Sequence, residues 1–201
     1  MTTRTLATPM SESPAVMRLF EAAADAFAAK GFHATTTRDI ASRAGLSPAG
    51  VYVHFASKED LLYQLCREGH EVARDALAAA AAEAGGPKEA LSDVVGTFAR
   101  WHAEQHQVAR IVQYEFRHLT EEHRNEVLGL RREIDGIVTQ VIEAGVTSDD
   151  FSVFDPRATA LAVTSMAVDV ARWYHPGVRQ SPEEIGRTYA GFALRLVGAG
   201  S

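Results

Sequence analysis

The sequence predicts an all-α protein, and three features of its 201 residues point to that class. Apolar residues recur at intervals of three and four along most of the chain, which is the spacing of one face of an α-helix. No segment sustains the alternation of apolar and polar residues that marks a half-buried strand. Six of the seven prolines stand where a helix would begin or where the chain would break.

The start and stop signals of helices divide the chain into nine expected elements. A capping residue followed by proline opens several of them, and glycine closes several others. Residues 1–13, rich in Thr, Ser and Pro, precede the first helix and are expected to form a disordered lead. The expected helices cover about residues 14–30, 38–44, 48–55, 58–84, 88–105, 108–118, 121–144, 156–174 and 182–197.

Each boundary follows from local chemistry. Gly31 and Gly45 end the first two helices, and one of the threonines at 35–37 supplies the cap between them. Ser47-Pro48 opens the third helix, and Ser57 with Asp60 resembles a capping box for the fourth. In the second half, Gly85-Gly86-Pro87 is the clearest break, while Asp155-Pro156 and Ser181-Pro182 open the last two helices.

The composition bounds the class of protein. Apolar residues make up 46% and charged residues 23% of the chain, as in ordinary globular proteins. A net charge of −6 argues by itself against a nucleic-acid-binding protein, because such proteins tend to be basic. The single cysteine, Cys66, excludes an intramolecular disulfide. The chain has neither an apolar run of about 18 residues nor a signal-peptide core, so we expect a cytoplasmic protein without a membrane partner.

The two short helices near the N-terminus are the most informative segment. Helices of under about ten residues are not stable alone in water, so both need packing from their neighbours. Their joining by a glycine-containing turn is typical of a helix-turn-helix. Between Lys30 and Lys58 the chain carries four basic residues and one acid, so this segment is locally positive and the acidic excess lies beyond residue 60. The residues expected to form the small core are Ile40, Ala41, Ala44, Leu46, Val51 and Phe55.

About fifty residues then resemble, in order and spacing, the N-terminal DNA-binding domain of the TetR family of bacterial transcriptional regulators. The segments that carry the resemblance are Phe27 to Phe32, Thr35 to Ala41, Ala44 to Ser47, and Gly50 to Leu62. The resemblance implies a three-helix, helix-turn-helix domain over residues 14–60 and a homodimer that binds a palindromic operator in double-stranded DNA.

The resemblance also assigns residues to the DNA. Those in positions that grip phosphates in the family are Thr36, Thr37, Tyr52, His54 and Lys58, and those on or beside the groove-facing surface are Ser47, Pro48, Ala49, Gly50 and Val53. Arg38, at the start of the second helix, is added to the DNA-binding set. Val53 departs from the family, where an aromatic or polar residue is common. A valine cannot hydrogen-bond a base edge but can contact a thymine methyl.

Residues 61–201 are expected to form the ligand-binding and dimerisation domain, with the last two helices pairing with those of a second subunit. The segment from Val170 to Ile185 resembles a subgroup that responds to fatty acyl-CoA or sterol-derived acyl-CoA thioesters. This implies a repressor released by an acyl-CoA-type ligand, with another hydrophobic ligand as the alternative. The candidate ligand-binding residues are Trp101, Gln105, Arg110, Gln113, Tyr114, Arg117, Met166 and Trp173.

Two other classes of protein are weighed against a regulator: an all-α enzyme and a helical adaptor without DNA binding. The chain shows no phosphate-binding loop, nucleophile elbow or Ser/His/Asp order, so no catalytic residue and no cofactor are predicted. His102 and His106 have a spacing that suits a metal, but no third ligand is evident, and no metal site is predicted. The presence of residues at the family's phosphate-contacting positions argues against an adaptor that does not bind DNA.

Overall fold

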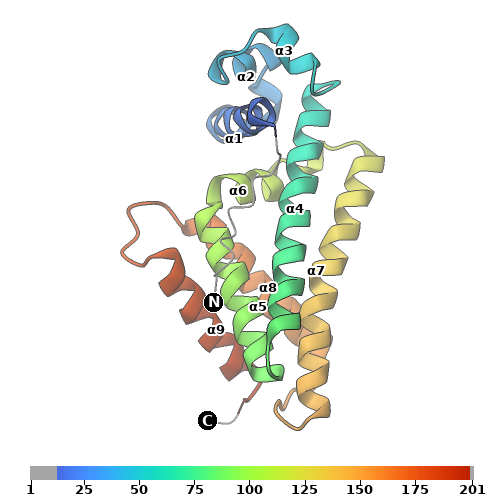
Figure 1. The fold of residues 1–201 in the computed structure, drawn as a ribbon, viewed down its shortest axis with the longest axis vertical. Helices are drawn as coiled ribbons and strands as arrows, with labels where there is room; N and C mark the ends of the chain where they lie inside the picture. Colours follow the sequence, from blue (N-terminus) through green and yellow to red (C-terminus); the bar gives the residue numbers. More distant parts are fainter. Residues whose placement is uncertain (1–12, 200–201) are drawn as a thin grey trace. The chain divides into compact units, whose positions relative to one another are not determined.

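The computed structural model describes residues 13–199, so all but the last residue of the predicted disordered lead lies outside the described part. Within the described residues the regular elements are all helical (Figure 1), which confirms the predicted fold class. The elements are α1 Pro14–Ala34, α2 Thr37–Arg43, α3 Pro48–Tyr52, α4 Lys58–Glu83, α5 Pro87–Glu104, α6 His106–Tyr114, the 3₁₀ helix η1 Phe116–His118, α7 Glu121–Thr147, α8 Pro156–Trp173 and α9 Pro182–Leu196.

The chain divides into two compact units, each assembled from two stretches of sequence. Unit 1 contains the described residues up to Val72 together with residues 107–129, and unit 2 contains residues 73–106 and the chain from Leu130 onward. Helices α4 and α7 therefore contribute residues to both units. The domain bounds expected from the sequence, 14–60 and 61–201, differ from this division and stay a prediction.

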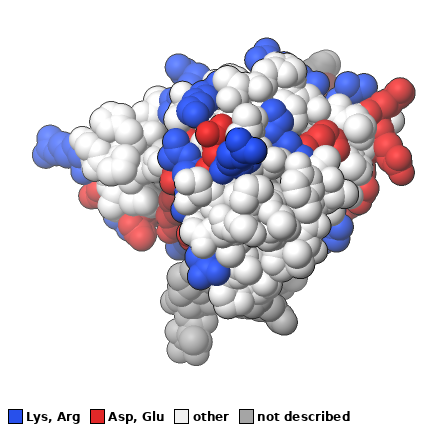
Figure 2. Space-filling view, turned by 90° about the horizontal axis from the view of Figure 1, so that it is seen from above, with Lys and Arg blue, Asp and Glu red and all other residues white. Residues whose placement is uncertain are grey.

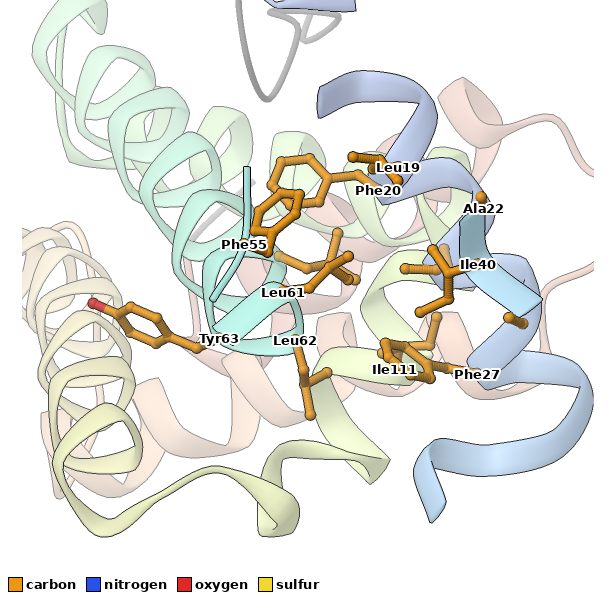
Figure 3. Close-up of a cluster of buried hydrophobic side chains, with 14 of the residues drawn as sticks. Leu19, Phe20, Ala22, Phe27, Ile40, Phe55, Leu61, Leu62, Tyr63 and Ile111 are labelled. Atoms are coloured by element: carbon orange, nitrogen blue, oxygen red, sulfur yellow. The ribbon is translucent and has the colours of Figure 1, made fainter. Parts of the chain in front are cut away.

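Unit 1 is built around large apolar side chains that join α1, α2 and α3 to the first half of α4 (Figure 3). Phe20, Phe27 and Leu61 are almost completely buried. The rings of Phe20 and Phe55 lie 5.5 Å apart, so α1 contacts the segment that follows α3. Burial of each such side chain contributes roughly 1.5–3 kcal/mol, which supplies the stability that α2 and α3 lack by themselves.

Unit 2 contains a close helix crossing between α5 and α9. A Cβ atom on Gly186 would lie 2.7 Å from the backbone oxygen of Gly96, so the two backbones approach more closely than any larger residue would allow. Buried apolar residues on both helices, among them Val94 and Ile185, fill the space around this crossing. The glycines are therefore required by packing and not by a turn.

The capping predictions are confirmed at four helix starts. Thr36 and Ser181 form capping boxes with Asp39 and Glu184, and the side chains of Ser47 and Asp155 accept backbone N–H bonds at the starts of α3 and α8.

At α4, Ser57 accepts from the Asp60 N–H, while the Asp60 carboxylate accepts from the backbone of Ala56. The capping residues and first-position prolines in the sequence therefore predicted these helix starts correctly.

Four helix ends differ from the prediction. Helix α3, expected to reach about residue 55, ends at Tyr52. Gly31 leaves helical geometry with φ of 74°, but the helical turn resumes and α1 ends at Ala34. Helix α6 ends at Tyr114, and a separate 3₁₀ turn follows. Helix α7 passes through Gly145 to Thr147. The Phe151 ring occupies the space where a Cβ of residue 145 would lie. That glycine makes room for a side chain and does not end the helix.

No helix among residues 13–199 combines the length and apolar character needed to cross a membrane.

Candidate DNA-binding surface

The turn between α2 and α3 holds the two short helices against the core of unit 1. Gly45 adopts φ of 67°, a conformation that an L side chain rarely takes, and the Leu46 N–H bonds the Ala41 carbonyl at 2.9 Å. Ile40 and Val51, one from each helix, are fully buried. Because Ile40 and Val51 point inward, the opposite faces of both helices are left at the surface.

The structure places ten of the eleven predicted DNA-binding residues on α2, on α3 or directly beside them, and Lys58 at the start of α4. Most are exposed: Thr36, Arg38, Ser47, Pro48, Ala49, Tyr52, Val53 and His54. Thr37, Gly50 and Lys58 are partly buried. The surface they form is accessible to a large partner such as a DNA duplex.

Several hydroxyl groups of this surface are engaged in bonds within the protein. The hydroxyls of Thr37 and Tyr52 are hydrogen-bonded at 3.2 Å, which ties α2 to α3. The Ser47 hydroxyl accepts the Gly50 N–H at 3.1 Å. Thr36 caps α2 through reciprocal bonds with Asp39. These bonds fix the surface before any partner arrives, which reduces the conformational entropy that binding must remove.

The surface carries more basic than acidic side chains, and Asp39 balances part of the positive charge. The Asp39 carboxylate lies 3.5 Å from the Lys30 ammonium. Hydrogen bonds from Thr36, with Lys30 adding a smaller effect, hold the pKa of Asp39 below its ordinary value. Arg38 and Arg43 are exposed. Figure 2 shows Lys and Arg groups interspersed with broad uncharged areas on the face seen from above, with most acidic groups toward its margins.

Lys58 has a role that the sequence did not reveal. Its ammonium donates to the carbonyl oxygens of Phe32 and Thr35, at 2.6 and 2.7 Å, and lies 4.2 Å from the centre of the Phe32 ring. Burial lowers the pKa of this ammonium. Lys58 therefore satisfies carbonyl groups at the C-terminal end of α1, where Thr35 directly precedes Thr36, the N-cap of α2. At most one of its three N–H groups is left for a phosphate.

A second set of contacts that the sequence did not reveal lies at Phe32, directly after the kink at Gly31. The Phe32 N–H donates to the Glu115 carboxylate at 3.2 Å. The His118 ring stacks on the Phe32 ring with centroids 5.1 Å apart. Glu115 and His118 come from the 3₁₀ segment after α6, eighty residues further along the chain, so only the tertiary structure could pair them with Phe32.

The eight candidate ligand-binding residues fall in two groups. In unit 2, Trp101 is buried, Met166 and Trp173 are partly buried against the core, and Gln105 is exposed at the end of α5. In unit 1, the other four occupy α6 and η1, and all but the partly buried Gln113 are exposed: Arg110, Gln113, Tyr114 and Arg117. Ligand binding by these residues stays a prediction.

Unit 2 also carries an open groove of about 620 Å³ between α7 and α8. None of the eight candidate residues lines it. Its lining is Arg132, Asp135, Gly136, Thr139, Gln140, Glu143, Arg157, Ala160 and Leu161. Charges of both signs line this groove.

The two histidines with metal-compatible spacing each contact a backbone carbonyl. Nδ1 of His102 lies 2.9 Å from the Phe98 oxygen, and Nδ1 of His106 lies 3.0 Å from the Ala103 oxygen. Among the residues that the structure describes, no three His, Cys, Asp or Glu side chains are grouped so that they could hold a metal ion.

A helix-turn-helix with an exposed outer face, in one chain with a separate helical unit, is typical of DNA-binding regulators. The chain belongs to the TetR family of bacterial regulatory proteins. Residues 19–65 match the family's N-terminal domain, and residues 84–197 match a tetracyclin repressor-like C-terminal domain. The protein is accordingly a DNA-binding transcriptional regulator and not an enzyme.

Similar proteins support this assignment. The chain is 41% identical to a solved tetR-family regulatory protein from Rhodococcus RHA1, with a TM-score of 0.87 over 94% of this chain and 100% of the other. It is 31% identical to the transcriptional repressor KstR2 of Mycobacterium tuberculosis H37Rv, over 88% of this chain and 89% of the repressor. It is 30% identical to the fatty acid metabolism regulator protein of Bacillus subtilis, over 70% and 74% of the two chains.

Proposed function

We propose that this protein is a homodimeric repressor that binds a palindromic operator through α2 and α3 and is released by an acyl-CoA-type or other hydrophobic ligand. The observation that carries the proposal is the exposed α2–α3 surface, with its engaged hydroxyls and flanking arginines. The repressor KstR2, similar over most of its length, supports the direction of regulation. Binding to an operator would place the protein in the cytoplasm with the chromosome.

The homodimer is supported by apolar surface on the last two helices. Leu161 on α8 is 62% exposed, and Phe192 and Leu196 on α9 are 43% and 47% exposed. Large exposed apolar side chains on both helices suit an interaction site, and Leu161 also lines the groove between α7 and α8. A second copy that covered these side chains would bury them and would bring two α3 helices to one duplex, as a palindromic operator requires.

The ligand class is supported by two observations of different kinds. The segment from Val170 to Ile185 resembles regulators that respond to acyl-CoA thioesters, and one similar protein is named for fatty acid metabolism. Of the proposed binding residues, those in unit 2 include the aromatic side chains Trp101 and Trp173, which suit an apolar ligand. Apolar walls with a few polar anchors are the usual composition of such sites.

Release follows from linkage between the two binding events. A ligand lowers operator affinity only if it binds the DNA-free conformation more tightly, and DNA must then weaken ligand binding by the same factor. Helix α4 is one candidate for the connection, because it begins three residues after Phe55 and supplies residues to both units.

Selection of bound fragments from random DNA, followed by fluorescence anisotropy on the recovered duplex, tests the proposal. We expect a palindromic site, and we expect affinity for it to fall at least tenfold with one member of a panel of CoA thioesters, as a coupling of about 1.4 kcal/mol would give. Absence of any selected sequence would refute operator binding. An unchanged affinity with every thioester and free fatty acid would refute the ligand class and leave DNA binding intact.

A further inference from the structure

The outward face of α3 presents apolar side chains where a reader of bases would more commonly present hydrogen-bonding groups. Ala49 and Val53 lie one helical turn apart, because the Val53 N–H bonds the Ala49 carbonyl at 3.2 Å. Both are exposed, and Val53 is 77% exposed. We name these two residues the apolar strip of α3.

Packing within unit 1 does not account for the strip. Val51 and Phe55, at 0% and 4% exposure, already fill the inward side of this segment. An exposed valine at the end of a five-residue helix contributes nothing to the core and has lower helix propensity than alanine. The strip is therefore free to contact a partner outside the molecule.

The nearby polar groups are poorly placed to replace the strip as readers of bases. Residues 48–52 include no Asn, Gln, Arg or Lys, the side chains that make bidentate bonds to base edges. The Ser47 hydroxyl caps α3, and the Tyr52 hydroxyl is bonded to Thr37. The side chains of α3 therefore offer few hydrogen bonds to base edges, although the outer face of the helix is open to a groove.

We propose that Val53, supported by Ala49, reads the C5 methyl group of a thymine in each half-site of the operator. The thymine methyl is the one apolar group that base pairs present in the major groove, and alanine and other apolar side chains contact it. This inference rests on the proposed operator binding and adds which chemical feature of the operator α3 recognises. Loss of one such methyl contact weakens binding about fourfold per half-site.

Deoxyuridine substitution tests the proposal, because deoxyuridine differs from thymidine only by the methyl group. In the duplex recovered by selection, each thymidine is replaced in turn, symmetrically in both half-sites, and affinity for the full-length protein is measured by anisotropy. We expect one thymine position, at which wild-type affinity falls about 15-fold for the two half-sites together. Val53→Ala should bind the thymidine and deoxyuridine duplexes within about twofold of each other, because it removes the two Cγ methyl groups that reach furthest from α3 and leaves only Cβ.

His54→Ala is the matched control, since it changes the adjacent exposed residue. It should weaken binding to both duplexes equally and retain the wild-type penalty for deoxyuridine. If wild type binds the selected duplex but tolerates every deoxyuridine, the inference fails while operator binding stands. If Val53→Ala keeps the full deoxyuridine penalty, another residue reads the methyl, and the assignment to Val53 is wrong. If no duplex is selected at all, both proposals fall.

Discussion

Unit 1 and unit 2 are stabilised in different ways. In unit 1, α2 and α3 have seven and five residues, too short to persist alone, and large buried side chains together with bonds from caps and Lys58 hold them. In unit 2, α5 and α8 have 18 residues and α9 has 15, and the crossing of α5 with α9 depends on glycines that let backbones meet. Unit 1 is sensitive to losing volume, and the unit 2 crossing is sensitive to gaining it.

The largest effect is expected from removing an aromatic ring in unit 1. Phe20→Ala should lower the free energy of unfolding by about 3–5 kcal/mol, because it leaves a cavity between α1 and the segment around Phe55. Urea unfolding followed by circular dichroism measures the loss. The two tryptophans, Trp101 and Trp173, both lie in unit 2, so their fluorescence reports that unit separately. A loss under about 1 kcal/mol would contradict the dependence of unit 1 on this ring.

The next largest effect is expected from adding a single methyl group in unit 2. Gly186→Ala should cost about 1–3 kcal/mol, because the new Cβ meets the backbone oxygen of Gly96 and the helices must separate. Tryptophan fluorescence during urea unfolding would detect it.

Gly136→Ala on α7 is the matched control, since nothing lies within 4 Å of its added Cβ, and it should raise stability by up to about 1 kcal/mol. Equal effects of the two substitutions would show that the crossing is not tight.

A smaller effect separates the two roles of Lys58. Lys58→Met removes the bonds to the Phe32 and Thr35 carbonyls, so stability should fall by about 1–2 kcal/mol. Operator affinity should fall as well, with little change in its dependence on salt.

Arg43→Met, which removes an exposed cation, should instead reduce the salt slope by up to about one unit if Arg43 contacts a phosphate. A Lys58→Met protein of unchanged stability with a slope reduced by about one would make Lys58 a phosphate ligand and not a tie between helices.

A pH-dependent effect concerns the partly buried carboxylate of Glu68 on α4. Burial raises the pKa of Glu68 from 4.5 to about 7, with Glu71 adding to the shift and Arg67 opposing it. Between these two values the folded chain holds the proton more tightly than the unfolded chain. The associated stability is therefore complete below about pH 4.5 and is lost as the pH rises toward 7.

Glu68→Gln should lack this loss, so its stability advantage over wild type should grow from about pH 5 to about pH 8. Denaturation at both pH values measures the difference, with the exposed Glu143→Gln as control. A constant difference across the range would contradict the raised pKa.

Local signals in the sequence identified most helix starts because a cap depends on residues three apart. Thr36 with Asp39 and Ser181 with Glu184 are visible as pairs in the chain, and their bonds form as expected. Glycine was less informative. Gly45 marks a turn with positive φ, but Gly145 and Gly186 serve packing against Phe151 and Gly96, partners that the local sequence does not identify.

The candidate DNA-binding surface shows the same division at the level of single residues. The spacing of the motif placed Tyr52 and Val53 on α3, and both are exposed. The motif could not show that the Lys58 ammonium bonds carbonyls of residues 32 and 35, nor that Glu115 accepts the N–H freed by the kink at Gly31. These contacts join positions 23 to 83 residues apart, and they depend on how the helices pack.

The sequence by itself therefore determined the helical class, the helix-turn-helix, the family and the face of α3 that is open to a partner. The helical class and the helix-turn-helix follow from periodicity, caps and the glycine turn, while the family and the open face of α3 follow from the resemblance of residues 15–63 to the TetR family. Only the tertiary structure decided the division into two units and the close approach of α5 and α9. It also decided the partners of two lysines: the Lys30 ammonium lies beside the Asp39 carboxylate, and the Lys58 ammonium bonds a carbonyl of α1. The physical reason is that these features depend on distances between residues far apart in the chain, which close only when the apolar cores form.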